Sequence, residues 1–141
     1  MVSPGPRGHH VLLELFGCRV AACDDPDVVR TGLHAAVSAL DTEVLGEVYH
    51  RFSPRGVSAV VLIGASHLSC HTWPELGYAA LDIYTCGDVH PDAAVRQLIA
   101  TFGATTWLLR DVLRGQLDTP PRHSFETTDA LVAPGMHIPT E

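Results

Sequence analysis

The feature that most constrains the fold of this chain is a short apolar run, V-S-A-V-V-L-I, at residues 57–63. Its β-branched residues favour a strand, and its length is typical of a strand rather than of a helix. Since Ser58 is the only polar residue in the run, the sequence predicts a strand that is covered on both faces. The turn signature S-P-R-G at residues 53–56 directly precedes it.

Four other segments are predicted to be strands. They are residues 10–16, 43–52, 77–86 and 105–113. Gly46 interrupts the second of them, and we expect a β-bulge there. The stretch from residue 64 to residue 76 contains several polar side chains and Pro74, which predicts a loop.

Two segments are predicted to be helices, each with proline near its first turn. The first begins at D-D-P-D, residues 24–27, and the second at G-D-V-H-P-D, residues 87–92. Apolar residues then recur at helical spacing, so that each helix has one apolar face. These residues are Val29, Leu33, Ala36, Val37 and Leu40 in the first helix, and Ala94, Leu98 and Phe102 in the second.

The order of these elements is β-α-β-β-β-α-β, which predicts an α+β domain in two layers. We expect a mostly antiparallel sheet with two helices on one face, formed by residues 1–115. A chain of 141 residues suits one such domain. Residues 116–141 are rich in proline and have little periodicity, which predicts an extended C-terminal tail.

Composition argues against several classes of protein. Hydrophobic residues make up 46% and charged residues 18% of the chain, which is typical of a globular protein. The net charge of −7 argues against nucleic-acid binding, because phosphate recognition requires clustered basic residues. No apolar run approaches the ~20 residues that span a bilayer, and the N-terminus lacks the apolar core of a signal peptide. We therefore expect a cytoplasmic protein that binds neither nucleic acid nor membranes.

Reactive side chains are concentrated at residues 64–75, G-A-S-H-L-S-C-H-T-W-P-E, directly after the apolar run. Ser66 and His71 lie close together in the sequence, and a serine with a histidine can form a nucleophile and its base. A purely structural role, with polar residues at the end of the sheet, explains the same stretch. Cys86 ends the following predicted strand and comes near this stretch if residues 57–63 and 77–86 pair as neighbouring strands.

The four cysteines are expected to be free thiols, because none forms a C-x-x-C pair and no export signal is present. They are Cys18, Cys23, Cys70 and Cys86. The first two are expected to be buried or half-buried. Metal binding by His67, Cys70, His71 and Cys86 is a further interpretation of the cluster. Its spacing matches no zinc motif, and no metal is expected.

Two longer motifs are more specific than any single residue. H-R-F-S-P-x-G-V-S begins at His50, and S-H-L-x-x-H-T-W-P-E-x-G-Y-A-A-x-D-I-Y-T-C-G-D begins at Ser66. Together they resemble the prokaryotic S-adenosylmethionine decarboxylase proenzyme family. A looser resemblance includes G-H-H-V-L-L-E-L-F-G-C at residues 8–18, both predicted helices and the last predicted strand. It ends near residue 115 and does not include the tail.

Members of this family cleave their own chain and carry a pyruvoyl group. The resemblance implies a cut between Ala65 and Ser66, which begins when Ser66 Oγ attacks the preceding carbonyl carbon. His71 then assists removal of the Ser66 α-proton, and Ser66 becomes the pyruvoyl cofactor. Ser58 matches a serine that assists processing by a hydrogen bond to the developing oxyanion. The products would be residues 1–65 and residues 66–141.

The resemblance also implies the decarboxylation chemistry. The pyruvoyl carbonyl forms a Schiff base with the substrate amine and accepts electrons as CO₂ leaves. Cys86 matches the proton donor, and a cysteine thiol is mostly protonated at neutral pH, as a donor must be. Phe52 and Trp73 match aromatic residues suggested to stack on the adenine, and Glu75 matches a carboxylate suited to the ribose hydroxyls.

The family implies a homodimer with sites near the subunit interface, in which two such domains form a larger sandwich. Relatives usually have glutamate before the processing serine, whereas this chain has Ala65. The attack is on a backbone carbonyl, so the missing carboxylate removes no reacting atom. Cys70 and His9 are further departures.

Two alternatives stay open beside an S-adenosylmethionine decarboxylase of polyamine (spermidine) biosynthesis. One is a pyruvoyl-dependent arginine or ornithine decarboxylase derived from the same family. The other is an unprocessed, non-catalytic homologue. The presence of Phe52, Trp73 and Glu75 favours S-adenosylmethionine as the substrate, and Ala65 keeps both alternatives open.

Overall fold

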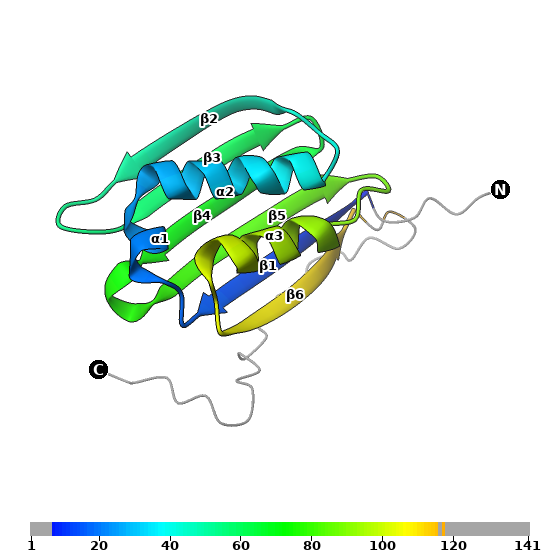
Figure 1. Ribbon diagram of the computed structural model, residues 1–141. Helices are drawn as coiled ribbons and strands as arrows, with labels where there is room; N and C mark the ends of the chain where they lie inside the picture. Colours follow the sequence, from blue (N-terminus) through cyan, green and yellow to red (C-terminus); the bar gives the residue numbers. More distant parts are fainter. Residues whose placement is uncertain (1–6, 116, 118–141) are drawn as a thin grey trace.

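The computed structural model describes residues 7–115 and residue 117. Six antiparallel strands form one sheet, and the helices lie over one of its faces (Figure 1). The strands are β1 (Gly8–Phe16), β2 (Val44–Arg51), β3 (Val57–Ile63), β4 (Ser66–Trp73), β5 (Tyr78–Cys86) and β6 (Thr106–Arg114). The helices are α1 (Val20–Asp24), α2 (Pro26–Ala39), α3 (Asp92–Phe102) and the 3-10 helix η1 (Pro74–Leu76). The predicted two-layer α+β fold is confirmed, and the predicted tail lies, except for residue 117, outside the described residues.

Both predicted helices are present, with their predicted apolar faces buried. Asp25 caps α2, because its side chain accepts a hydrogen bond of 2.9 Å from the backbone N–H of Asp27. Pro26 occupies the first helical position, where a missing N–H costs no hydrogen bond. The fully buried members of the two faces are Val29, Leu33, Ala36, Ala94, Leu98 and Phe102. The sequence does not predict α1, whose five residues are too few to show a helical repeat.

The strand order β2-β3-β4-β5-β1-β6 places the first strand of the chain between two later ones. β1 pairs with β5 on one side and with β6 on the other. The N-terminal segment therefore lies in the middle of the C-terminal half of the sheet. The bulge predicted at Gly46 is present, since the register of β2 on β3 shifts between Val44 and Gly46.

Residues 64–76 are not a loop, and this prediction is wrong. Ser66–Trp73 forms β4, which lies between β3 and β5. Leu68, Cys70 and Thr72 of β4 are buried, while the residues between them point to the other side. The alternation is inconspicuous in the sequence because two of the three buried positions, Cys70 and Thr72, are not large apolar residues.

Strand β3 is covered on one face only, so the prediction of a strand covered on both faces is wrong. Its odd-numbered residues, from Val57 to Ile63, are buried in the layer beneath the helices. Val60 and Leu62 point the other way and are 46% and 53% exposed. Among the described residues, no element covers this other side of the sheet, which we call the open face (Figure 1).

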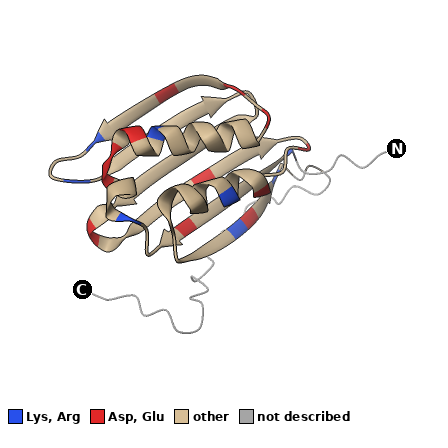
Figure 2. Ribbon diagram, viewed as in Figure 1, with Lys and Arg blue, Asp and Glu red and all other residues tan. Residues whose placement is uncertain are grey.

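Charged residues are dispersed over both layers rather than gathered on one element (Figure 2). In the described part of the chain, no two arginines are adjacent in the sequence. No helix among these residues is long and apolar enough to cross a membrane.

Candidate active site

The strand register divides the predicted site residues into two groups at opposite ends of β3 and β4. The first, which we call the cleavage group, consists of Ala65, Ser66 and Cys86. The second, which we call the hollow group, consists of Phe52, Ser58, His71, Trp73 and Glu75. Each group is compact, and their separation decides what one chain can do.

The cleavage group is assembled by the pairing of β4 with β5. Ala65 lies in the tight turn between β3 and β4, and Ser66 is paired with Thr85. The backbone N–H of Cys86 donates a hydrogen bond of 2.9 Å to the carbonyl oxygen of Ala65. This carbonyl is the one that Ser66 is predicted to attack, and an N–H so placed can stabilise negative charge that develops on the oxygen.

Cys86 reaches the predicted cut by a different route from the one anticipated. β3 and β5 are not neighbours, because β4 lies between them. Cys86 is instead brought to Ala65 by the direct pairing of β5 with β4. Its side chain is exposed at the end of β5, so the thiol is open to a small molecule.

The backbone at Ser66 is strained. Its φ of 142° is positive, which residues with a Cβ rarely adopt. Among the described non-glycine residues, only Asp41 shares this property. Such a conformation costs about 1–3 kcal/mol, and strain of this kind is found at functional sites. Cleavage of the Ala65–Ser66 bond would release it.

Ala65 itself is buried, with 6% of its surface exposed. A methyl side chain is therefore packed against the core directly before Ser66. The predicted cut depends on the carbonyl of Ala65, whose hydrogen bond to Cys86 involves only backbone atoms.

The hollow group lines one depression of about 430 Å³ at the other end of β4. Its walls are formed by Phe52, Arg55, Ser58, His71, Thr72, Trp73 and Glu75. All five members of the hollow group, which come from residues 52–75, therefore meet at one place. The volume lies within the ~300–1,000 Å³ that is typical of small-molecule sites.

Ser58 and His71 form the polar part of the hollow. They are directly opposite each other on β3 and β4. Ser58 Oγ lies 2.7 Å from His71 Nδ1, which is hydrogen-bond distance. The contact holds the imidazole ring in one orientation and links the two residues predicted to assist processing.

Aromatic side chains form the apolar part of the hollow. Trp73 stacks on Tyr78 with a centroid distance of 5.2 Å, and Tyr78 stacks on Phe16 at 5.4 Å. Phe52 and Trp73 are 47% and 40% exposed, which excludes simple core packing for them. Burial, together with a hydrogen bond from its hydroxyl to Glu14, raises the pKa of Tyr78. This tyrosine therefore stays neutral and supports Trp73.

Arg55 and Tyr78 are members of this region that the sequence analysis does not select. Arg55 lines the hollow from the S-P-R-G turn, where it is interpreted only as a turn residue. Tyr78 lies behind Trp73. Arg55 occupies the unspecified position of the first motif quoted above, and Tyr78 is a specified residue of the second. Position within a motif was therefore the feature that could have identified both.

The two groups do not meet within one chain. Ser66 and His71 are five residues apart on the same strand, which corresponds to about 16 Å at a rise of ~3.3 Å per residue. A general base must lie within ~3 Å of the proton that it removes, or one water molecule away. His71 therefore cannot reach Ser66 of its own chain.

The cysteines and histidines of β4 do not converge on a metal ion as one set. Cys70 is buried on the helix side of β4, and burial raises the pKa of its thiol. His67 and His71 alternate with it and face the open side. All four cysteines are free, and Cys18 and Cys23 are buried, as expected.

Comparison with known proteins gives a consistent family match. The family model described as S-adenosylmethionine decarboxylase matches residues 9–115. A relative from Syntrophomonas wolfei, named S-adenosylmethionine decarboxylase proenzyme, is 45% identical over 114 residues, covering 80% of this chain and 90% of the relative. A relative of the same name from Acidithiobacillus ferrooxidans is 36% identical over 129 residues, covering 89% of this chain and 97% of the relative.

A solved structure agrees with the sequence match. The crystal structure of the adenosylmethionine decarboxylase from Aquifex aeolicus VF5 has a TM-score of 0.75 and 31% sequence identity. The alignment covers 87% of this chain and 100% of that chain.

Proposed function

The chain belongs to the S-adenosylmethionine decarboxylase family, and we propose that it is a self-processing decarboxylase that removes CO₂ from S-adenosylmethionine in polyamine (spermidine) biosynthesis. The observation that carries the self-processing step is the hydrogen bond of 2.9 Å from Cys86 N–H to the Ala65 carbonyl. It polarises the carbonyl directly before Ser66, where the backbone is strained.

Processing follows from the cleavage group. Ser66 Oγ attacks the Ala65 carbonyl carbon, and the oxyanion that forms on the Ala65 oxygen accepts a hydrogen bond from the N–H of Cys86. Collapse of this adduct expels the Ser66 nitrogen, which takes up a proton, and leaves an ester. A base then removes the Ser66 α-proton, and elimination releases residue 65 as a carboxylate. The dehydroalanine left at residue 66 rearranges to an imine, and water converts the imine to a ketone with loss of ammonia.

We place this base on a second copy of the chain, because His71 of the same chain lies about 16 Å away. The two copies would be related by a two-fold axis that lies between their open faces and runs perpendicular to the strands. This axis brings the cleavage group of one copy opposite the hollow group of the other. His71 of the partner subunit then serves Ser66, and two equivalent composite sites result. The dimer would be the larger sandwich predicted from the family.

The surface of the open face supports this arrangement. Several large apolar residues point away from the helices and are exposed in one chain. They are Leu12, Val48, Val60, Leu62 and Val112, with exposures from 36% to 63%. A second open face would bury them, and apolar burial drives association at ~25 cal/mol per Å² before the costs of binding.

The hollow group suits an adenosine moiety. Trp73 and Phe52 present aromatic surface for the adenine, and the Glu75 carboxylate can accept hydrogen bonds from the ribose hydroxyls. The pyruvoyl group formed from Ser66 supplies the carbonyl that accepts electrons during decarboxylation. The exposed thiol of Cys86, next to the cut, holds the proton that replaces the lost carboxyl group.

Intact mass and CO₂ release test this function together. We expect the purified protein to contain residues 1–65 and a blocked chain that begins at residue 66. It should release CO₂ from S-adenosylmethionine and not from arginine or ornithine. A chain that stays whole after long incubation would support the non-catalytic alternative, and activity with a free amino acid alone would overturn the substrate.

A further inference from the structure

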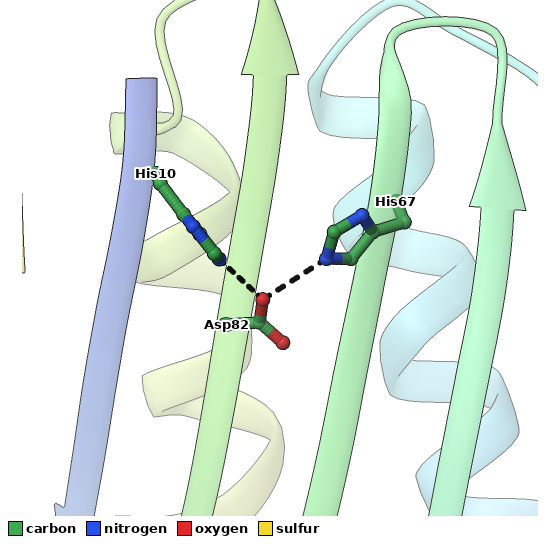
Figure 3. Close-up of side chains that lie close together, drawn as sticks. All are labelled: His10, His67 and Asp82. Atoms are coloured by element: carbon green, nitrogen blue, oxygen red, sulfur yellow. Dashed lines mark hydrogen bonds and ion pairs between the residues drawn. The ribbon is translucent and has the colours of Figure 1, made fainter. Parts of the chain in front are cut away.

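The open face carries another cluster of side chains, which the proposed reaction does not use. It consists of His10 on β1, His67 on β4 and Asp82 on β5 (Figure 3). His10 Nε2 lies 2.5 Å from Asp82 Oδ2, and His67 Nε2 lies 3.0 Å from the same oxygen. In the described part of the chain, it is the only set of three or more histidine, cysteine, aspartate or glutamate ligand atoms within 4.8 Å of one another.

Strand register produces this convergence. β5 lies between β4 and β1, so Asp82 is flanked by a neighbouring strand on each side. His10 and His67 are both paired with Tyr84, two residues beyond Asp82 on β5. Both imidazoles therefore reach Asp82 diagonally on one face, from opposite sides. The Tyr84 ring lies 5.2 Å from the ring of His10 and 5.8 Å from that of His67, which restricts their rotation.

Ser69 holds the carboxylate of Asp82 in place. It is paired with Asp82 across β4 and β5 and donates a hydrogen bond to Oδ1. Oδ2 is thereby turned toward the two imidazoles, an arrangement typical of the groups that orient metal ligands. Burial alone would raise the pKa of Asp82, but the hydrogen bonds from Ser69, His10 and His67 together have the larger effect, so that the pKa is lowered. The group is therefore a carboxylate at neutral pH.

We propose that His10, His67 and Asp82 form a binding site for a divalent transition-metal ion, with Zn²⁺ as the best match. Two imidazole nitrogens and one carboxylate oxygen are a ligand set that Zn²⁺ uses, with a fourth position left for water. Ligands at ~2.0–2.2 Å from one ion lie roughly 3–4 Å apart. Binding would require His10 Nε2 to move outward by about 1 Å and both Nε2 atoms to be deprotonated.

One positive charge opposes such an ion. Arg114 Nη1 lies 3.4 Å from His10 Nδ1, and the guanidinium stacks 4.7 Å from the centre of the Tyr84 ring. Like charges repel, and a guanidinium donor at Nδ1 favours the tautomer of His10 that carries a proton on Nε2. Metal binding therefore competes with Arg114. Because of this competition, removal of the Arg114 side chain should strengthen metal binding.

The site could not be recognised from sequence spacing. His10 and Asp82 are 72 positions apart, and the three ligands come from three strands. The expectation that no metal is bound rested on the spacing of the histidines and cysteines around β4, which does not include His10 or Asp82. Only the strand order brings them together.

The experiment measures metal in the full-length Ser66→Ala protein, which should remain one chain, so that the result is independent of self-processing. Because the open face is proposed to be covered in a dimer, zinc is measured both as incorporated during expression and after chelation and refilling. We expect about one Zn²⁺ per chain by elemental analysis. Co²⁺ added to the metal-free protein should give the visible absorption of a nitrogen- and oxygen-bound ion.

Variants then locate the ion. Asp82→Asn and His10→Gln should each weaken Zn²⁺ binding at least tenfold, and Arg114→Gln should strengthen it several-fold. His34→Gln is the matched control, because His34 Nε2 also lies 2.5 Å from a carboxylate, that of Glu47, without a second imidazole. His34→Gln should bind Zn²⁺ as tightly as the parent protein does. Far-UV circular dichroism and cooperative thermal unfolding without added zinc establish that each variant is folded.

Three results would overturn the proposal. They are a zinc content far below one per chain in the parent protein, undiminished binding in folded Asp82→Asn and His10→Gln, and equal loss in His34→Gln. Weaker binding in Arg114→Gln would contradict the position of the ion. Self-cleavage of the wild-type protein is measured separately by intact mass, so each proposal can fail alone.

Discussion

If the composite site is correct, the inactive Ser66→Ala variant should restore processing to the inactive His71→Ala variant. Ser66→Ala removes the nucleophile and keeps His71, whereas His71→Ala removes the base and keeps Ser66. In a heterodimer of the two, the Ser66 of one chain faces the His71 of the other. Cleavage is then expected in the His71→Ala chain alone, so that about half of the chains are cut.

The magnitude follows from the distance of about 16 Å between Ser66 and His71 along β4. A base at that distance contributes nothing, whereas one within hydrogen-bond reach contributes about 10²–10⁴-fold. The heterodimer should therefore complete cleavage about 10²–10⁴ times faster than His71→Ala alone, which should stall at the ester. Hydroxylamine should cut the stalled chain and reveal the ester.

The assay uses two affinity tags on co-expressed chains, so that only heterodimers are purified, and intact mass resolves cut from uncut chains. The matched control pairs His71→Ala with the double variant Ser66→Ala/His71→Ala, which has no histidine to offer and should not be cut. Absence of cleavage in the test heterodimer would refute the composite site. Rapid cleavage of His71→Ala alone would remove His71 from the reaction.

Three further predictions concern other contacts. Cys86→Ala keeps the backbone N–H bonded to Ala65, so processing should continue while CO₂ release falls by about 10²-fold or more. Unchanged CO₂ release would exclude the thiol as proton donor. Trp73→Ala should raise KM for S-adenosylmethionine about tenfold, since aromatic stacking contributes about 0.5–1.5 kcal/mol beyond area burial. An unchanged KM would place the adenine elsewhere. The hydrogen bond from His34 lowers the pKa of Glu47, so its stabilisation is present above the pKa of an unfolded glutamate and is lost as pH falls through the lower, folded value. Thermal unfolding of Glu47→Gln should lose part of its acid dependence below about pH 5, and an acid limb identical to the wild type would contradict this.

Local patterns were sufficient for most of the fold. The helix that begins at Pro26 was predictable from its cap and its apolar spacing. The bulge at Gly46 was predictable because a glycine interrupts a predicted strand there. β4 was not, because Cys70 and Thr72 occupy its buried positions and the reactive residues suggested a loop. The exposure of Val60 and Leu62 was also missed, since an apolar strand has the same sequence pattern whether one chain covers one of its faces or both.

The candidate site was predictable only in part. The motifs selected Phe52, Ser58, His71, Trp73 and Glu75, and all five line the same hollow. They did not indicate that this hollow lies at the other end of the strand from Ser66. Sequence distance misled here, because five residues that would span little more than one helical turn extend about 16 Å in a strand.

The sequence by itself determined which faces of the two longer helices, α2 and α3, are buried, and it determined five of the six extended segments and the family to which the chain belongs. Such properties depend on neighbours within a few residues, or on motifs that are contiguous. The tertiary structure decided the order of the strands, and with it every contact between distant segments. It placed the N–H of Cys86 on the Ala65 carbonyl, kept His71 away from Ser66, and joined His10 to Asp82 across 72 positions. The physical reason is that strand register is set by packing of the whole sheet, which no local pattern records.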